Sequence, residues 1–406
     1  MQVLPVEQSP HAWVGRRRKA WLKVHRYLGL SVGVLLLFLS LTGSLLVFHD
    51  EIDEWFNPQL LRIEPKPGGE SDYRPVDELI SAAVRVMPKE AQLTFGDYPR
   101  TDAVAYTWHF LVPAVPDAKT RIDFALYHVF VNPYTAEVTG SRLVRPAGLG
   151  GAIPRTFIEF VFALHYALLL PRMGDPPFGD TVVAIIGLAL TLSLLSGLYL
   201  WWPRNEGWRS AFTIKRHAHI RRLNFDVHKT AGVYFALILL GIFVSGIFLN
   251  LREPFQTIVR LFSPVTDRYE VRSHVIPNSP NISLGEAIRI VKARYPEGRM
   301  DWLYIPRNPP GTFTICNREI EGISRFLTRR CVVVDQYSGE ILYTQSPDQG
   351  TAGEYFIQWQ WPFHSGQAFG LPGRWIVFTS GLICPILFGT GFYLWWRKRT
   401  VRRRAP

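Results

Sequence analysis

Four long stretches without a charged residue dominate the sequence. They span residues 28–48, 182–202, 230–251 and 376–396, and each is 21 or 22 residues long. At 1.5 Å of rise per residue, a helix of about 20 apolar residues crosses the roughly 30 Å hydrocarbon core of a membrane. Buried helices of a soluble protein rarely produce four such windows. The sequence therefore predicts an α-helical membrane protein with four transmembrane helices.

The distribution of Lys and Arg predicts how these helices are oriented. The first 26 residues carry six basic residues and one acid, residues 203–229 carry seven and two, and residues 397–406 carry six and none. Because cytoplasmic segments are enriched in Lys and Arg, we expect a multi-pass membrane protein with both termini in the cytoplasm, located in the bacterial cell inner membrane if the host is Gram-negative. The net charge of +12 then reflects topology and contact with membrane lipid, and it does not indicate nucleic-acid binding.

The chain repeats itself. The pattern H-x3-G-x12-[T/S]-G begins at His25 and again at His228, 203 residues later, and the pattern [S/T]-G-x-Y-L-W-W begins at Ser196 and again at Thr390. Repeats of this kind are typical of proteins built from one structural unit used twice. We therefore interpret the chain as an internal duplication in which each half is a helix, an outer domain and a second helix.

The two long connections share a pattern of their own. V-F-V-N-P-Y-T-A-E at residues 129–137 matches V-V-V-D-Q-Y-S-G-E at 332–340, and helical stretches at 76–86 and 284–294 come before them. Alternating β-branched and aromatic runs predict strands, so we expect two periplasmic α+β domains. The predicted segments are a cytoplasmic N-terminus (1–27), the first transmembrane helix (28–48), the first periplasmic domain (49–155), an interfacial helix with the second transmembrane helix (156–202), a cytoplasmic loop (203–229), the third transmembrane helix (230–251), the second periplasmic domain (252–355), a periplasmic segment with the fourth transmembrane helix (356–396) and a cytoplasmic tail (397–406).

Four of the eleven histidines recur between the halves. His25 corresponds to His228 near the cytoplasmic ends of two helices, and His165 corresponds to His364 before the outer ends of the other two. A histidine near a bilayer is costly unless it has a partner. A duplication places its copies around a pseudo-twofold axis, and two facing neutral imidazoles suit the two axial positions of a haem iron. Zinc would require further ligands, and no Cys or carboxylate recurs beside these histidines.

The pattern therefore predicts two haems, one held by His25 and His228 and one held by His165 and His364. The alternative is that all four are interfacial or core histidines without a cofactor. If these residues are not the ligands, His49 is the next candidate.

The order of these elements, together with H-R-Y-L-G, V-H-K-T-A-G and Y-L-W-W, resembles the PepSY-associated transmembrane family, in particular its ferric-siderophore reductase branch (PiuB/FoxB-type). The resemblance covers nearly the whole chain and rests on the order of short motifs. It implies two PepSY-like periplasmic domains, two bis-histidine haem b groups, and electron transfer across the inner membrane to a periplasmic ferric siderophore. Because Fe(II) is softer and less charged than Fe(III), one electron weakens a complex built from hard oxygen donors.

The sequence contains no recognisable site for an electron donor. Without a phosphate loop, a flavin signature or a C-x-x-C-H motif, we expect a quinol or a separate cytoplasmic reductase to supply the electrons. Two other functions stay open: a quinol-linked cytochrome that serves another periplasmic acceptor, and a non-enzymatic interaction or regulatory protein. Residues near the outer histidine pair are candidates to receive the substrate: Arg155, Tyr166, Arg172, Trp359, Trp361 and Arg374.

Two of the three cysteines flank one short connection. Cys316 and Cys331 are separated by 14 residues in the second outer domain, where an oxidising compartment permits a disulfide. The alignment places His109 and His128 at the equivalent positions of the first domain. If the strands that carry these residues pair, a possible disulfide in one domain is replaced by a histidine pair in the other. Solvated strand histidines are the default interpretation of that pair, and metal binding is the alternative.

Overall fold

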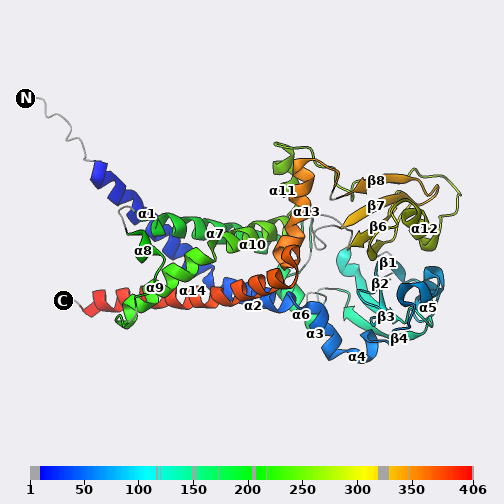
Figure 1. Ribbon diagram of the computed structural model, residues 1–406, viewed down its shortest axis with the longest axis horizontal. Helices are drawn as coiled ribbons and strands as arrows, with labels where there is room; N and C mark the ends of the chain where they lie inside the picture. The colour runs from blue at the N-terminus through cyan, green and yellow to red at the C-terminus, as the bar shows by residue number, and fades with distance from the viewer. Residues whose placement is uncertain are drawn as a thin grey trace, which may run out of the picture.

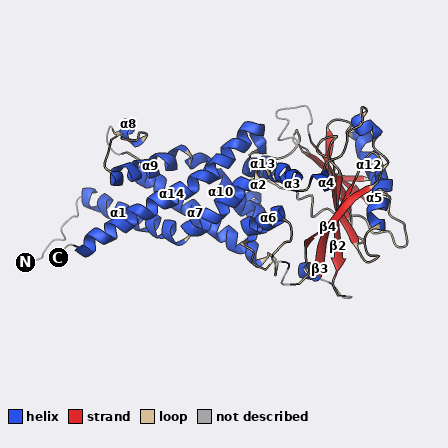
Figure 2. Cartoon of the chain, turned by 90° about the horizontal axis from the view of Figure 1, so that it is seen from below, coloured by secondary structure: helices blue, strands red, loops and turns tan. Residues whose placement is uncertain are grey.

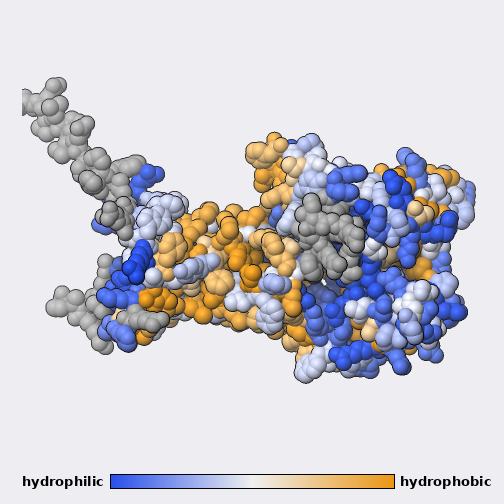
Figure 3. Space-filling view, in the orientation of Figure 1, coloured by the Kyte–Doolittle hydropathy of each residue, from blue (hydrophilic) through white to orange (hydrophobic). Residues whose placement is uncertain are grey.

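The computed structural model describes residues 10–404, except 116–117, 119, 149–150, 152, 172, 204–206, 216, 319–328 and 347. A bundle of helices forms one end of the molecule and a β-sheet forms the other (Figure 1). The first described turns of α1 and the end of α14 both lie at the end of the bundle that is far from the sheet. Apolar side chains gather over the bundle, between polar surfaces at its free end and over the sheet (Figure 3).

Helices of very different lengths make up the bundle and its margins. Those of the bundle are α1 (Pro10–Ser31), α2 (Gly33–Leu46), α6 (Phe157–Ala167), α7 (Phe178–Trp201), α9 (Ile220–Tyr234), α10 (Ala236–Asn250), α13 (Ala352–Ser365) and α14 (Gly370–Arg404). Shorter helices at its margins are α3 (His49–Phe56), α4 (Pro58–Leu61), α8 (Trp208–Ala211) and α11 (Arg252–Arg260).

Within the described residues, two helical segments are each long and apolar enough to cross a membrane, namely Phe178–Trp201 and Gln367–Thr400. Two bent pairs pass the same test when taken together: α1 with α2, and α9 with α10, with bends of 58° and 62°. The expectation of a helical membrane protein is confirmed, with two spans, or up to four if each bent pair is one span. The apolar windows at 28–48 and 230–251 fall on these bent pairs rather than on straight helices.

Packing within the bundle follows a regular scheme. Helix α2 packs against α14 and α6, and α10 packs against α7 and α13, while α1 lies on α7 and α9 lies on α14. Glycines permit close approach: a Cβ on Gly381 of α14 would meet the hydroxyl of Ser44 on α2, and a Cβ on Gly241 of α10 would meet the ring of Phe363 on α13. Small residues at helix contacts are typical of membrane bundles, where van der Waals packing holds helices together.

The β-sheet combines strands from both long connections. Its strands are β1 (Gln92–Asp97), β2 (Tyr106–Pro113), β3 (Phe124–Val131), β4 (Val138–Arg145), β5 (Arg299–Tyr304), β6 (Thr312–Arg318), β7 (Arg330–Asp335) and β8 (Ile341–Gln345). They are arranged in the order β4-β3-β2-β1-β5-β6-β7-β8, and neighbouring strands are antiparallel. Because β1 pairs with β5, the two outer segments share one continuous sheet instead of forming two separate sheets.

The two faces of the sheet have different surroundings. Helices α5 (Val76–Arg85) and α12 (Leu284–Arg294) cover the face that points away from the bundle (Figure 2). Side chains alternate along a strand, so on β2 the buried Trp108 and Phe110 belong to the core beneath these helices. Thr107 and His109 point to the opposite face, where they line a cavity next to the bundle.

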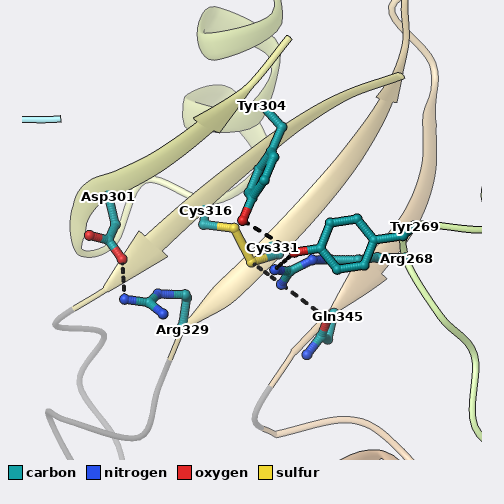
Figure 4. Close-up of a disulfide and its surroundings, with 8 residues drawn as sticks. All are labelled: Arg268, Tyr269, Asp301, Tyr304, Cys316, Arg329, Cys331 and Gln345. Carbon is teal, nitrogen blue, oxygen red and sulfur yellow. Dashed lines mark hydrogen bonds and ion pairs between the residues drawn. A yellow bond between two sulfur atoms is a disulfide. The ribbon is translucent and has the colours of Figure 1, made fainter. Parts of the chain in front are cut away.

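Two cross-strand pairs occupy matching places in this sheet. Cys316 on β6 and Cys331 on β7 lie directly opposite each other and form a disulfide (Figure 4). Arg268 covers it, with Nη1 at 2.8 Å from Sγ of Cys331. His109 on β2 and His128 on β3 are also directly opposite, and their ring centroids are 4.0 Å apart. The strands that carry these residues therefore pair, as the sequence analysis required for a disulfide.

Candidate functional site

Two pairs of histidine rings face each other inside the bundle. His25 on α1 and His228 on α9 have ring centroids 6.1 Å apart, and we call them the terminus-side pair. His165 on α6 and His364 on α13 have centroids 6.0 Å apart and form the sheet-side pair. The structure thus brings together the partners that the sequence analysis assigned to each haem, although they are 203 and 199 positions apart in the chain.

Each of these histidines is held by the same three-part unit of a neighbouring helix, which we call a cradle. A backbone carbonyl accepts a hydrogen bond from Nδ1 of the ring, the hydroxyl of the Ser or Thr three residues later lies near the same nitrogen, and a glycine follows directly. The carbonyl and hydroxyl oxygens are at 2.9 and 3.2 Å for His25 (Ser193 and Ser196 of α7), 2.9 and 3.1 Å for His165 (Leu39 and Thr42 of α2), 2.9 and 3.0 Å for His228 (Leu387 and Thr390 of α14), and 3.1 and 2.9 Å for His364 (Ile242 and Ser245 of α10).

The glycine of each cradle brings its helix close to the ring. Non-bonded carbon atoms normally stay about 3.5 Å or more apart, and a Cβ at any of these glycines would come closer than that to Cε1 of the histidine. The distances would be 2.8 Å between Gly43 and His165, 2.9 Å between Gly197 and His25, 3.2 Å between Gly391 and His228, and 3.3 Å between Gly246 and His364. A larger residue at these positions would therefore displace the ring.

The cradle also determines which ring nitrogen carries the proton. A carbonyl oxygen only accepts hydrogen bonds, so the Nδ1 atom facing it is the donor. The cradle hydroxyls donate to carbonyls of their own helices, as Ser196 does to Ser193 at 2.7 Å. Nε2 therefore keeps its lone pair. Histidines that bind metals commonly donate their other N–H to a backbone carbonyl in this way, which fixes the orientation of the ring.

The spacing within each pair fits one iron between the two rings. With metal–nitrogen bonds of about 2.0 Å, two imidazoles on opposite axial positions have ring centroids about 6 Å apart, which matches the 6.1 and 6.0 Å found here. Among the described residues, no three or more His, Cys, Asp or Glu side chains are arranged to hold a metal ion. Because a porphyrin supplies four of the six ligands of its iron, a haem is the group that two imidazoles alone can complete.

The two pairs lie at different depths of the bundle. On α7, Gly197 contacts the terminus-side pair, whereas Gly187 contacts Ile247 beside the sheet-side cradle of α10. On α14, Gly391 lies next to His228 of the terminus-side pair, and Gly381 lies next to Ser44, beside the sheet-side cradle of α2. Ten residues separate the two levels on each helix, which corresponds to about 15 Å. The separation of the two levels is thus about half of the roughly 30 Å thickness of a hydrocarbon core.

A cavity of about 1400 Å³ extends from the sheet-side pair to the sheet. Its wall includes both rings of the pair, residues of α2, α7, α10 and α14, and, farther out, residues of α3, α6, β1, β2 and β3. Sites for a single small molecule typically measure roughly 300–1,000 Å³. The cavity is therefore large enough for a cofactor and a second ligand next to it.

The predicted substrate-side residues are distributed unevenly around this cavity. Tyr166, Trp361 and Arg374 line it. Arg155 is exposed away from its wall, and Trp359 packs near Phe369 instead. Arg172 lies outside the described residues.

Arg374 is paired with residues at the sheet-side end of the bundle and does not present an unpaired cation. Its guanidinium bonds both carboxylate oxygens of Glu51 at 2.7 Å and donates to the carbonyl of Val47. The start of α14 is thereby tied to the end of α2. We infer a structural contact for this side chain, at the margin of the cavity.

A second group of polar residues lines the part of the cavity next to the sheet. We call it the histidine–carboxylate cluster, and its members are His49, Asp50, Asp97, His109, His128 and Glu159. His49 donates to Asp50 at 2.9 Å, and Nε2 of His109 lies 2.7 Å from Asp97. The sequence analysis named His49 by itself and His109 with His128 as a pair, but it missed Glu159 and the convergence of these residues from α3, α6 and three strands.

Burial and neighbouring charges shift the pKa values of three members of this cluster in different directions. Burial raises the pKa of Glu159, and neighbouring His109, Arg142 and His49 only partly offset this effect. Burial lowers the pKa of His128 far below its usual value, and His109 adds to that effect. For His49, burial disfavours the charged form, but the Asp50 carboxylate and other acids outweigh it, so its pKa is raised.

The sequence profile of one protein family, described as the PepSY-associated TM region, matches residues 22–398. That match includes all four histidines of the facing pairs and the whole sheet. No curated protein matches the chain.

Proposed function

Because the chain belongs to the PepSY-associated TM region family, we propose that it is a di-haem b oxidoreductase of the bacterial inner membrane that transfers electrons to periplasmic ferric siderophores. The observation that carries this proposal is the repeated geometry of the histidine pairs. Both pairs have the same ring separation, the same protonated nitrogen and the same type of cradle. Core histidines without a cofactor would have no reason to repeat both the Nδ1 hydrogen bond to a carbonyl and a partner ring about 6 Å away.

In this proposal, His25 and His228 hold one haem, and His165 and His364 hold the other. When bound, each haem supplies an iron that changes reversibly between Fe(III) and Fe(II). The hydrogen bonds of the cradles fix the orientation of each of the four rings. Their spacing along the bundle, about 15 Å, supports a role in carrying electrons from one membrane face to the other.

The proposal extends to the origin and orientation of the chain. We infer an internal duplication, supported by the four equivalent cradles on α2, α7, α10 and α14, and we interpret the two halves of the sheet as PepSY-like domains. The basic termini and the basic connection 203–229 support a cytoplasmic location for the free end of the bundle. The sheet then lies in the periplasm, and a quinol or a cytoplasmic reductase is the electron donor.

The ferric siderophore is proposed as the acceptor because the large cavity connects the sheet-side pair with the sheet, and because the sequence motifs resemble those of ferric-siderophore reductases. A quinol-linked cytochrome with another periplasmic acceptor would share the haems but not the acceptor. A non-enzymatic interaction or regulatory protein would share neither.

Two measurements test the proposal in sequence. The purified protein should show haem b bands in its reduced-minus-oxidised spectrum, with two haems per chain; a preparation without haem under haem-sufficient expression would exclude the oxidoreductase. The dithionite-reduced protein is then mixed with ferric hydroxamate or ferric catecholate complexes in a stopped-flow instrument. Rapid reoxidation supports the acceptor, whereas an unchanged spectrum with both complexes, together with oxidation by another acceptor, would contradict it.

A further inference from the structure

The histidine–carboxylate cluster has no part in holding the facing rings, yet it lines the same cavity. Its residues come from α3, α6 and β1 to β3, which meet where the bundle joins the sheet. Helix α6 is the common element, because Glu159 lies in its first turn and His165 of the sheet-side pair lies near its end. A ligand in the cavity next to the sheet-side pair would therefore be close to both.

Among the described acids of the cluster, Glu159 is the one without a compensating partner, since Asp50 is paired with His49 and Asp97 with His109. No hydrogen bond or ion pair to its carboxyl group is found among the described residues, whereas neighbouring acids are paired: Asp53 with Arg142, and Glu54 with Arg100. Buried carboxyl groups without a partner keep their proton more readily than exposed ones. The charged or titratable groups around it are His49 and Asp53 on α3, His109 on β2 and Arg142 on β4, and α7 adds Asp180 to the same wall.

His128 shows that the hydrogen-bonding capacity of this cluster is incomplete. Its side chain is only 6% exposed, and both ring nitrogens are buried without a hydrogen-bond partner. Buried polar groups are normally satisfied, and an exception requires an explanation such as a water molecule or a bound ligand. The ring stands 4.0 Å from that of His109, which in turn contacts Asp97. The Asp97 side chain is 43% exposed, so the cluster reaches from the cavity to solvent.

We propose that Glu159 is a proton donor to an oxygen-liganded ferric complex held in the cavity, and that His109 and Asp97 connect it to solvent. This inference rests on the proposed function. One electron, supplied by the quinol or reductase, converts Fe(III) to Fe(II), and one iron–oxygen bond to the chelating ligand breaks. The proton of the Glu159 carboxyl group passes to that oxygen, which leaves a carboxylate. One proton taken up from bulk solvent then passes by way of Asp97 and His109 to the Glu159 carboxylate and restores the acid.

The proposed step has a physical advantage for release of the metal. An unprotonated hydroxamate or catecholate oxygen can bind the iron again, whereas a protonated oxygen is a much weaker ligand, since metal binding requires deprotonated donors. A positioned acid typically contributes about 10²–10⁴-fold to such a step. The proton requirement also distinguishes this acceptor from one that only receives an electron.

The first test measures the proton itself and does not depend on turnover. Infrared spectra of the haem-loaded protein at neutral pH should contain a carboxylic-acid C=O band that disappears in Glu159→Gln. The matched control is Glu54→Gln, which removes another acid from the same cavity wall, one already paired with Arg100. The band should persist in this control. A spectrum in which Glu159→Gln removes no protonated carboxyl band would overturn the inference.

The second test compares two oxidants of the dithionite-reduced protein. Ferric tris(acetohydroxamate) releases ligand oxygens that take up protons, whereas hexaammineruthenium(III) accepts an electron without a proton. Glu159→Gln should slow reoxidation by the first oxidant about a hundredfold or more and leave the second unchanged, and Glu159→Asp should restore part of the rate. Equal rates of wild type and Glu159→Gln with the hydroxamate would overturn the proton-donor role. If the hydroxamate fails to oxidise even the wild type while ruthenium succeeds, the proposed acceptor itself is wrong.

Discussion

Replacement of a cradle glycine tests whether the facing rings are positioned for a ligand between them. In Gly43→Ala, the new Cβ would stand 2.8 Å from Cε1 of His165. Carbon contacts relax at about 3.5–4.0 Å, so the ring has to retreat by roughly 0.7–1.2 Å. Because α2 itself prevents the His165 ring from moving toward the cradle, the ring should move away from α2, toward His364. The centroid separation then falls below the about 6 Å that two axial ligands of one iron require.

The expected magnitude follows from comparing this displacement with helix propensity. Ala is favoured over Gly in a helix interior by about 1 kcal/mol, so Gly43→Ala should not unfold α2. A metal site tolerates errors of roughly 0.5 Å, and a retreat beyond that should remove the sheet-side haem while the terminus-side haem stays. Gly246→Ala should have a weaker effect, because its Cβ would lie 3.3 Å from the His364 ring.

The assay is haem quantification on purified variants, combined with thermal unfolding followed by circular dichroism. Gly389→Ala is the control. This glycine lies on α14, another helix that carries a cradle, but it is exposed and has no atom within 4 Å of an added Cβ. It should retain both haems with equal or higher stability. If Gly43→Ala also retains both haems and gains stability like the control, the cradles do not position haem ligands.

Three further predictions address other parts of the structure. Thr390→Val keeps the carbonyl of its cradle but removes the hydroxyl 3.0 Å from Nδ1 of His228, so haem affinity should fall about tenfold without complete loss; unchanged affinity in a haem titration would mean that the carbonyl alone orients the ring. Cys331→Ser opens a disulfide that joins residues 15 positions apart, which should lower the free energy of unfolding of the sheet by about 3 kcal/mol in denaturant titrations, and free thiols in the untreated wild type would contradict the bond. Burial opposes ionisation of Asp267, but Arg252, with Nε and Nη2 each 2.9 Å from the carboxylate, outweighs it and lowers its pKa. This stabilisation is present above the unfolded pKa of about 3.9 and is lost as the pH falls below it, so acid unfolding of Asp267→Asn should show a weaker pH dependence than that of the wild type.

The histidine pairs could be predicted from sequence because the repeat itself relates their members. The offset of 203 residues links His25 to His228 without any knowledge of the fold. The cradles were within reach of the same reasoning. A Ser or Thr followed by Gly recurs in all four apolar windows, at positions 42, 196, 245 and 390, and each of these dipeptides contacts one of the histidines. The sequence analysis used these dipeptides only as marks of the repeat, because their closeness to the rings depends on how the helices are arranged.

Other features depend on contacts that no local pattern encodes. The bends at 58° and 62° interrupt apolar windows that look continuous in hydropathy. The joining of the two halves into one sheet depends on β1 and β5, whose residues Gly96 and Leu303 are opposite each other but 207 positions apart. The histidine–carboxylate cluster assembles from five elements, and Glu159 alone in an apolar helix carries no signal of the histidines that it meets.

Haem content of histidine variants is the most direct test of the central claim that two imidazole pairs each hold one iron. The wild type should bind two haems per chain. His25→Ala should lose the terminus-side haem only, His165→Ala should lose the sheet-side haem only, and the double variant should be colourless, as measured by absorption of the extracted haem per mole of protein. A wild-type protein without haem, or two haems retained in both single variants, would contradict the account.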